Sequence, residues 1–237
     1  MPLPPLNMIS LENALNHSAQ DSILDLSVRE LLERLGSSDP APGGGAAAAL
    51  AGALGAALVQ MTANLSIGRP KLADIEAHAR QIEAQAAELR QRLAQLGDAD
   101  AQAYARVSAA YKLPHQDPAQ DTERSTTIQA ALHEAAAVPL ETARLCAAVL
   151  ELAELAAPLL NRSVISDVMV GALLAQAALE SAALNVEVNL AAITDAGAAH
   201  ALQLELDRAR SGSAKRLART LDSARSRLSL IKAVAKS

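Results

Sequence analysis

Residues 43–65 read GGGAAAALAGALGAALVQMTANL, and this stretch decides the fold. No charged residue occurs between Asp39 and Arg69. Because Ala and Leu are strong helix formers, the stretch predicts one long apolar helix over about 44–65. Its length would also suit a bilayer. Ala drives membrane insertion only weakly, however, so we interpret the segment as a buried core helix. Small residues that would let other helices approach closely recur along it, at Ala48, Gly52, Gly55 and Ala56.

The composition favours an all-α protein and excludes several classes of function. Roughly a quarter of the 237 residues are Ala, which has a low strand propensity. Trp and Phe are absent and the net charge is −5, so a nucleic-acid partner is not expected. The single Cys146 excludes an intrachain disulfide framework and a cysteine-based zinc site. The N-terminus does not resemble a secretory signal, so we expect a cytoplasmic protein with no membrane partner.

The remaining hydrophobic patterns predict a helical bundle with two long apolar helices at its centre. The second apolar helix is expected over 164–193. A capping box at Ser27 and Glu30 opens a short helix that ends at Gly36. Amphipathic helices are expected over 71–96, with Gly97 as the terminating residue, and over 98–112 and 199–235. The segments 123–136 and 139–156 form either two helices or one helix kinked at Pro139. Residues 1–26 are an N-terminal extension, and residues 27–237 form one helical domain.

Several polar residues lie in apolar or glycine-rich surroundings and are candidates for chemistry. Three consecutive glycines before a helix can expose backbone N–H groups to an anion, although they can equally serve only close packing. Asp167 at the start of the second apolar helix is either a cap or a partly buried base. Two pairs lie one helical turn apart, namely Asp100 with Tyr104 and Asn185 with Asn189. The five histidines show no metal-binding spacing.

The ordered set of motifs resembles the formiminotransferase-cyclodeaminase C-terminal domain family. The motifs are SSDPAPGGG (37–45), NLSIGR (64–69), DAQAY (100–104), AYKLP (110–114), VPLET (138–142), NRSVISD (161–167) and NVEVN (185–189). The family includes methenyltetrahydrofolate cyclohydrolases and formiminotetrahydrofolate cyclodeaminases. The resemblance runs from about residue 27 to residue 197, and more loosely to the C-terminus.

The resemblance implies an all-α homodimer that binds a folate near the dimer interface, with the folate as substrate and no metal or redox cofactor. It implies Asp167 as the preferred general base, Asp100 as the next candidate, and Lys112 as an acid or a contact to the glutamate tail of the folate. The substrate-binding residues that it implies are Pro42, Gly43, Gly44, Gly45, Asn64, Gly68, Tyr104, Asn161, Ser166, Asn185 and Asn189, and Pro114 is matched to the family motif without an assigned role.

Three motifs depart from the usual family pattern, and in one of them Asn-Arg-Ser at 161–163 stands where the family has Asn-Pro-Asn. Pro70 and Leu72 stand where the family has Lys and Tyr, and His115 stands where it has Lys. The sequence therefore leaves three interpretations open. The protein is a cyclohydrolase or cyclodeaminase, with the cyclohydrolase favoured because no formiminotransferase segment is fused to it. Alternatively, it is a catalytically inactive folate-binding or scaffolding relative, or a structural bundle associated with a membrane through residues 40–68.

Overall fold

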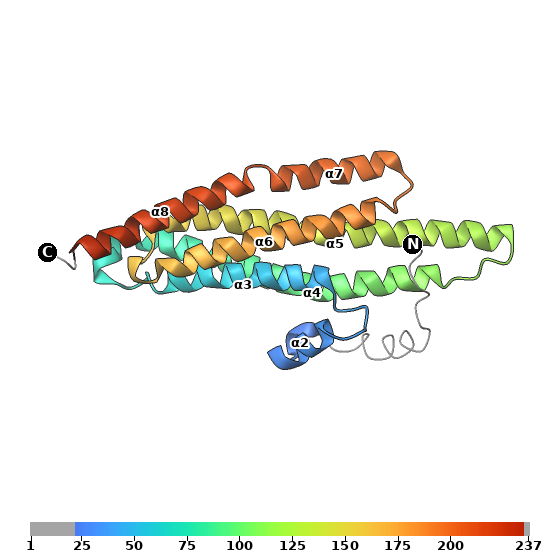
Figure 1. The fold of residues 1–237 in the computed structure, drawn as a ribbon, viewed down its shortest axis with the longest axis horizontal. Coiled ribbons are helices and arrows are strands. Elements are labelled where there is room, and N and C mark those ends of the chain that lie inside the picture. The colour runs from blue at the N-terminus through green and yellow to red at the C-terminus, as the bar shows by residue number, and fades with distance from the viewer. Residues whose placement is uncertain (1–21, 235–237) are drawn as a thin grey trace.

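The computed structural model describes residues 22–234, with side chains through residue 228, and every regular element in this range is helical (Figure 1). The elements in chain order are η1 (Ile23–Asp25), α2 (Val28–Leu35), α3 (Gly44–Asn64), η2 (Pro70–Ile75), α4 (Glu76–Tyr111), α5 (Pro118–Leu159), η3 (Arg162–Val164), α6 (Ile165–Leu190), α7 (Ala196–Arg210) and α8 (Ser213–Val234). The all-α prediction is confirmed. Most of the predicted extension over 1–26 lies outside the described residues.

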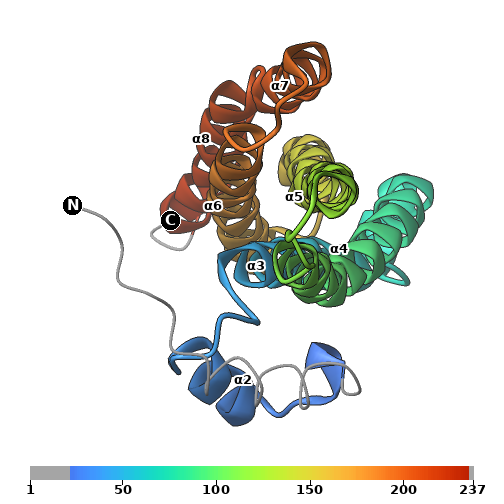
Figure 2. The same ribbon diagram turned by 90° about the vertical axis from the view of Figure 1, so that its right-hand side faces the viewer.

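Four helices, α3 to α6, pack in a ring in which each contacts the next and α6 returns to α3 (Figure 2). Glycines allow the backbones of α3 and α6 to approach each other. A Cβ on Gly55 would lie 2.7 Å from the carbonyl oxygen of Gly171, and a Cβ on Gly171 would lie 2.7 Å from that of Gly55. A Cβ on Gly52 would likewise lie 2.7 Å from the Sγ of Cys146 on α5. The small residues of α3 therefore serve close packing, as predicted.

The two apolar helices are neighbours in the ring, but the prediction that they form its centre is wrong. The central helix is α5, which packs against α3, α4, α6, α7 and α8. α3 and α6 each leave one apolar face uncovered. Both are long and apolar enough to cross a membrane, and 56% of the apolar window of α3 and 39% of that over Arg162–Leu190 are buried in the fold.

The helix expected to end at Gly97 continues through it, and α4 runs unbroken from Glu76 to Tyr111. Gly97 is buried, and a Cβ there would lie 2.7 Å from the Cδ1 of Ile23. This glycine therefore makes room for a residue distant in sequence instead of terminating the helix. The expected start at 71 is also corrected, because η2 occupies Pro70–Ile75.

Two further helix boundaries differ from the sequence prediction. α5 begins at Pro118, where the side chain of Asp117 accepts hydrogen bonds from two backbone N–H groups, and it continues through Pro139 as a single helix. The predicted final helix is instead two helices, α7 and α8. Gly212 separates them with a φ of +75°, which glycine adopts at little cost.

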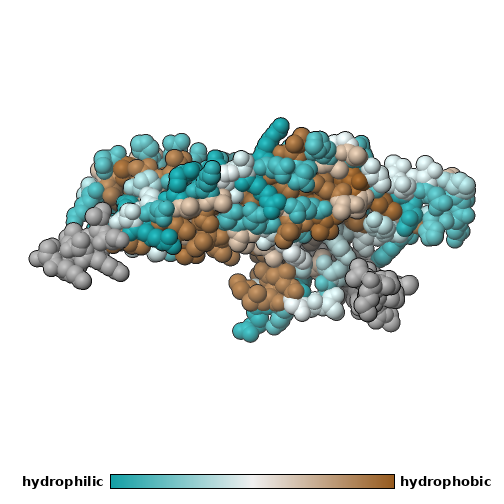
Figure 3. Space-filling view, turned by 45° about the horizontal axis from the view of Figure 1, so that its top comes forward, coloured by the Kyte–Doolittle hydropathy of each residue, from teal (hydrophilic) through white to brown (hydrophobic). Residues whose placement is uncertain are grey.

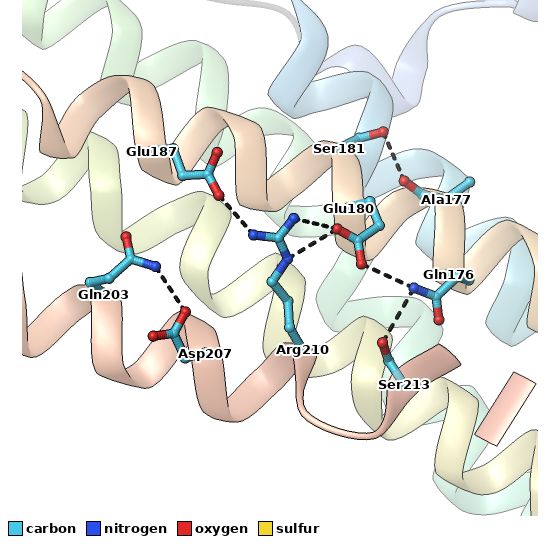
Figure 4. A network of polar contacts seen from close by, with 9 residues as sticks. All are labelled: Gln176, Ala177, Glu180, Ser181, Glu187, Gln203, Asp207, Arg210 and Ser213. Carbon is cyan, nitrogen blue, oxygen red and sulfur yellow. Dashed lines mark hydrogen bonds and ion pairs between the residues drawn. The ribbon is translucent and has the colours of Figure 1, made fainter. Parts of the chain in front are cut away.

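Polar contacts attach α7 and α8 to α6 (Figure 4). Arg210 at the end of α7 donates hydrogen bonds to Glu180 (Nη2 to Oε2, 2.5 Å) and Glu187 (Nη1 to Oε1, 2.7 Å). The Nε2 of Gln176 donates to Glu180 and to the Oγ of Ser213, the first residue of α8. The hydrogen bonds that Arg210 donates to Glu180 raise the pKa of Arg210. The junction between α7 and α8 is thus held on α6 by charge-assisted hydrogen bonds.

Candidate functional site

The first group of predicted residues meets where the N-terminus of α3 lies against α4. Gly43 is the N-cap of α3 and has no side chain to accept a hydrogen bond. The carboxylate of Asp100 on α4 instead accepts one from the backbone N–H of Ala46. The fit is close, because a Cβ on Gly45 would lie 2.0 Å from the Oδ1 of Asp100. Glycine at position 45 therefore gives this carboxylate its place at the helix N-terminus.

The surroundings of Asp100 suit proton transfer. Burial raises the pKa of Asp100 above its ordinary value, and the hydrogen bond from the N–H of Ala46 partly opposes this shift. A carboxylate with a raised pKa is a better proton acceptor near neutral pH. Tyr104 lies one turn further along α4, and 39% of it is exposed to solvent. The carboxylate and the phenol therefore border the same region of the surface.

The amides of Asn185 and Asn189 have different roles. A Cβ on Gly44 would lie 3.8 Å from the Nδ2 of Asn185, which places this amide at the N-terminus of α3. The Nδ2 of Asn189 donates to the backbone oxygens of Ala135 on α5 and of Asn185, both at 2.9 Å. Asn189 therefore joins α6 to α5. The Nδ2 of Asn185 donates to Ser181, and its Oδ1 accepts no hydrogen bond from any described residue, so the oxygen can accept one from a ligand.

A second group lies at the opposite end of α3. Asn161 is buried; its Nδ2 donates to the carbonyl oxygen of Leu65 (3.0 Å) and its backbone N–H donates to the Oγ of Ser66 (2.8 Å). The Oδ1 of Asn161 accepts from the N–H of Ser163. This amide therefore fixes the start of η3 against the end of α3.

The residues around Asn161 present the more accessible side chains of this second group. Asn64 ends α3 and is exposed, and Gly68 follows with a φ of +70°. Ser166 and Asp167 lie in the first turn of α6, the former exposed and the latter half-buried. Asp167 makes no hydrogen bond or ion pair with another described residue, so its carboxylate is available to a ligand or a partner.

The structure does not bring the two groups together within one chain. α3 has 21 residues, which span roughly 30 Å at the rise of an α-helix. Lys112 and Pro114 lie apart from both groups, at the exposed end of the α4–α5 hairpin. Three cavities of 340–370 Å³ lie between helices elsewhere, and none is lined by a predicted site residue. A single chain thus presents two separate half-sites, which we call the glycine half-site (Gly44, Gly45, Asp100 and Asn185) and the asparagine half-site (Asn64, Asn161, Ser166 and Asp167).

Sequence reasoning missed a pair of cationic side chains beside the asparagine half-site. Arg227 on α8 donates to the carbonyl oxygens of Ala157 and Leu160, both at 2.7 Å, and so caps the end of α5. Burial and the neighbouring charge of Arg162 lower the pKa of Arg227. Arg162 has no acidic partner among the described residues. No local pattern could have found the pair, because 65 positions separate its members.

Comparisons with known proteins converge on one family. A family model described as formiminotransferase-cyclodeaminase matches residues 27–208. A methenyltetrahydrofolate cyclohydrolase of Methylorubrum extorquens is 42% identical over 76% of this chain and 87% of its own length. The formimidoyltransferase-cyclodeaminase of Rattus norvegicus is 35% identical over 74% of this chain, which corresponds to only 32% of the rat protein. The crystal structure of a formiminotetrahydrofolate cyclodeaminase from Thermotoga maritima superposes with a TM-score of 0.77 at 27% identity, covering 86% of this chain and 98% of that one.

Proposed function

This chain belongs to the formiminotransferase-cyclodeaminase family and is a folate one-carbon enzyme, and we propose that it hydrolyses 5,10-methenyltetrahydrofolate to 10-formyltetrahydrofolate. The observation that carries the proposal is the carboxylate of Asp100, which lies on the N-terminus of α3 beside the unoccupied amide oxygen of Asn185. Cyclisation of 5-formiminotetrahydrofolate with loss of ammonia is the second candidate, supported by the rat and Thermotoga relatives. Hydrolysis is favoured because the cyclohydrolase relative is the more similar over nearly its whole length.

Asp100 is the general base in this proposal. Water adds its oxygen to the cationic methenyl carbon between N5 and N10 of the folate, and Asp100 takes the proton that the water loses. Asp100 then returns that proton to N5 as the bond between N5 and the carbon breaks. The hydroxyl proton of the adduct leaves to solvent, and the carbon stays on N10 as a formyl group.

Asp100 comes before Asp167 in this proposal, which is the reverse of the ranking made from the sequence. Asp100 is the partly buried carboxylate, and its raised pKa suits proton transfer. Asp167 lies at the other half-site and is partnerless among the described residues. A carboxylate there can stabilise the positive charge of the methenyl bridge if it reaches the same folate.

A homodimer completes the site in this proposal. α3 and α6 carry a stripe of exposed large apolar side chains, which we call the apolar stripe; its members are Leu54, Met61, Leu65, Val170, Leu173, Leu184 and Val188. Their spacing of three, four, seven and eleven residues fits a heptad pattern, which is typical of helices that pack against another pair of helices. A contiguous exposed patch of this kind marks an interaction surface.

Two-fold symmetry sets the direction of this pairing. The same stripe must serve both subunits, so residue i of one contacts j of the other and j contacts i. In this proposal the axis stands perpendicular to α3 near its middle, so the two α3 helices run antiparallel. The glycine half-site at the start of one α3 then faces the asparagine half-site at the end of the other. Each dimer thus holds two complete sites, and each site combines Asp100 of one subunit with Asp167 of its partner.

The Arg162–Arg227 pair supplies positive charge to the same site. A folate carries carboxylates on its glutamate tail, and a guanidinium binds a carboxylate through two parallel hydrogen bonds. Because Arg162 lies beside Arg227 and has no acidic partner among the described residues, we assign it to the tail. This assignment accounts for tail binding in a chain in which Pro70 and His115 replace the usual lysines.

The proposal is tested by following the ultraviolet absorbance of 5,10-methenyltetrahydrofolate, because the conjugated bridge absorbs and the opened product does not. Loss of absorbance beyond the spontaneous rate, in proportion to protein concentration, is the expected result. If absorbance is unchanged but appears with 5-formiminotetrahydrofolate, the protein is the cyclodeaminase. No turnover of either substrate, combined with binding of the folate, would identify an inactive relative and overturn the proposal.

A further inference from the structure

Helix α2 stands apart from the bundle although it is well formed. Figures 1 and 2 show it below α3, separate from the four-helix ring. Its start is fixed by the capping box, in which Ser27 and Glu30 bond reciprocally, and it ends at Gly36. None of its residues is buried. An isolated helix of eight residues is not stable in water, so a covering surface is expected.

One face of α2 is apolar and open to solvent. Val28 and Leu32 lie one turn apart and are 74% and 63% exposed, and Leu31 and Leu35 flank them. The space-filling view shows hydrophobic surface on the part of the molecule that stands off below the bundle, where α2 lies (Figure 3). The charged residues Arg29 and Glu33 occupy the other face, as the helical period requires.

Both ends of the segment that carries α2 are tied to the same short stretch of α4. Before α2, the Oγ of Ser22 and the backbone N–H of Ile23 donate to the carboxylate of Asp98, at 2.5 and 2.7 Å. After α2, Pro42 is buried and the N–H of Ala46 bonds to Asp100. The base of the segment is thus fixed at the glycine half-site while its helix projects away from its own bundle.

We propose that α2 is an arm that packs against the partner subunit, at the end of the partner's α3 that carries Met61 and Leu65. This inference rests on the antiparallel dimer proposed above. α2 lies alongside the first half of its own α3 (Figure 1), below the ring on the side of α3 (Figure 2). In an antiparallel pair this place faces the second half of the partner's α3. The two arms of a dimer then contact equivalent surfaces.

The exposed apolar area supports packing of α2 against the partner subunit. The seven side chains of the apolar stripe leave on the order of 650 Å² of apolar surface, short of the roughly 800 Å² per partner of a standard interface. Adding the exposed part of Leu24, Val28 and Leu32 brings the total to on the order of 900 Å². The arm therefore supplies the area that the stripe lacks.

The arm connects dimerisation to the active site. The loop that leaves α2 at Gly36 runs directly into Pro42 and Gly43, so a partner that holds α2 also restrains the approach to Gly45 and Asp100. The partner surface at Met61 and Leu65 is adjacent to Asn64 of the asparagine half-site. Each arm would thus bridge the two half-sites that form one complete site.

Disulfide trapping between two differently tagged full-length chains tests the arm directly. One chain carries Leu32→Cys and the other carries Met61→Cys, and the native Cys146 is buried, so its background reactivity is low. The matched control replaces Leu32→Cys with Glu33→Cys, on the opposite face of α2. We expect the first pair of cysteines to form a disulfide between the two differently tagged chains at least tenfold faster than the control pair. The proposal would be overturned by equal rates for the two pairs. It would also be overturned if the protein is a dimer in solution and no disulfide forms between the differently tagged chains.

A second experiment separates the arm from the dimer itself. Val28→Ser with Leu32→Ser should raise the dissociation constant of the dimer at least tenfold, without lowering the melting temperature of the bundle. Turnover should fall only at concentrations at which the variant dissociates. If the wild-type protein is monomeric, the dimer proposal fails together with the arm. If the variant dimerises like the wild type, the arm alone is refuted. The same holds if amide hydrogen exchange shows that α2 is protected in monomers.

Discussion

Replacing Gly45 with Ala should disable the enzyme through a single methyl group. The new Cβ would lie 2.0 Å from the Oδ1 of Asp100, 2.5 Å from its Cγ and 2.7 Å from its Oδ2. Ordinary contacts begin near 3.4 Å, so the carboxyl group must move by about 1.4 Å or α3 must shift away from α4. Either movement breaks the hydrogen bond from the N–H of Ala46, which holds Asp100 in place.

The expected magnitudes follow from these distances. Misplacing a reacting group by about 1 Å costs roughly 100-fold in rate, so kcat/KM of Gly45→Ala should fall about 100-fold. Overpacking costs about 1–3 kcal/mol, and the higher helix propensity of Ala returns at most about 1 kcal/mol. The net loss in the free energy of unfolding should therefore be about 0–2 kcal/mol. Activity should be affected much more than stability.

Two glycine variants on the same helix serve as controls. Gly52→Ala also introduces a close contact, 2.7 Å from the Sγ of Cys146, but it lies two turns along α3 from Gly45. It should lower the melting temperature while the turnover of the folded protein stays normal. Gly44→Ala meets only ordinary contact distances and should leave the melting temperature unchanged. The assay is the loss of methenyltetrahydrofolate absorbance, with thermal unfolding measured in parallel. Wild-type turnover in Gly45→Ala would refute the assignment of Asp100.

Four further predictions concern charge and packing. Asp100→Asn should abolish turnover without destabilising the bundle at pH 7. Because burial raises the folded-state pKa of Asp100, the wild type loses stability as the pH rises through that value, and Asn removes this cost; a large drop in melting temperature would contradict it. As the pH is lowered, the kcat/KM of the wild type should fall with a midpoint above the pKa of an ordinary Asp, because the pKa of Asp100 is raised. Leu184→Glu with Val188→Glu should give a folded monomer in sedimentation and little activity in the absorbance assay. A fully active dimer would show that the apolar stripe is not the dimer interface. Arg210→Ala should cost about 1 kcal/mol of unfolding free energy, because its partners are partly exposed, and an unchanged denaturation midpoint would show that the pairs are not needed.

The helices and the small-residue packing of α3 followed from local patterns, because Gly52 and Gly55 lie within one apolar, charge-free run. The role of Gly97 did not follow, because the residue that needs its missing side chain, Ile23, is distant in sequence. The break at Gly212 was also missed, because the apolar spacing continues on both sides of it. Glycine alone does not tell a turn from a close contact; the tertiary neighbour decides.

The candidate site shows the same limit. The motifs identified Asp100, Asn185 and the glycines, and the structure places these residues together. The proposed order of the two acids rests on burial, which no local pattern contains. The sequence also could not show that Asp167 lies at the far end of α3, since motifs fix chain order and not spatial separation.

Mixing two inactive variants tests the central claim, that each site combines residues of two subunits. Asp100→Asn and Asp167→Asn homodimers should each be inactive, because both of their sites lack one carboxylate. After mixing in equal amounts and exchange of subunits, half of the dimers are mixed, and each of these has one intact site. The specific activity should therefore rise to about a quarter of the wild-type value. If the mixture stays inactive although the tagged chains have exchanged, both acids act within one chain and the composite site is wrong.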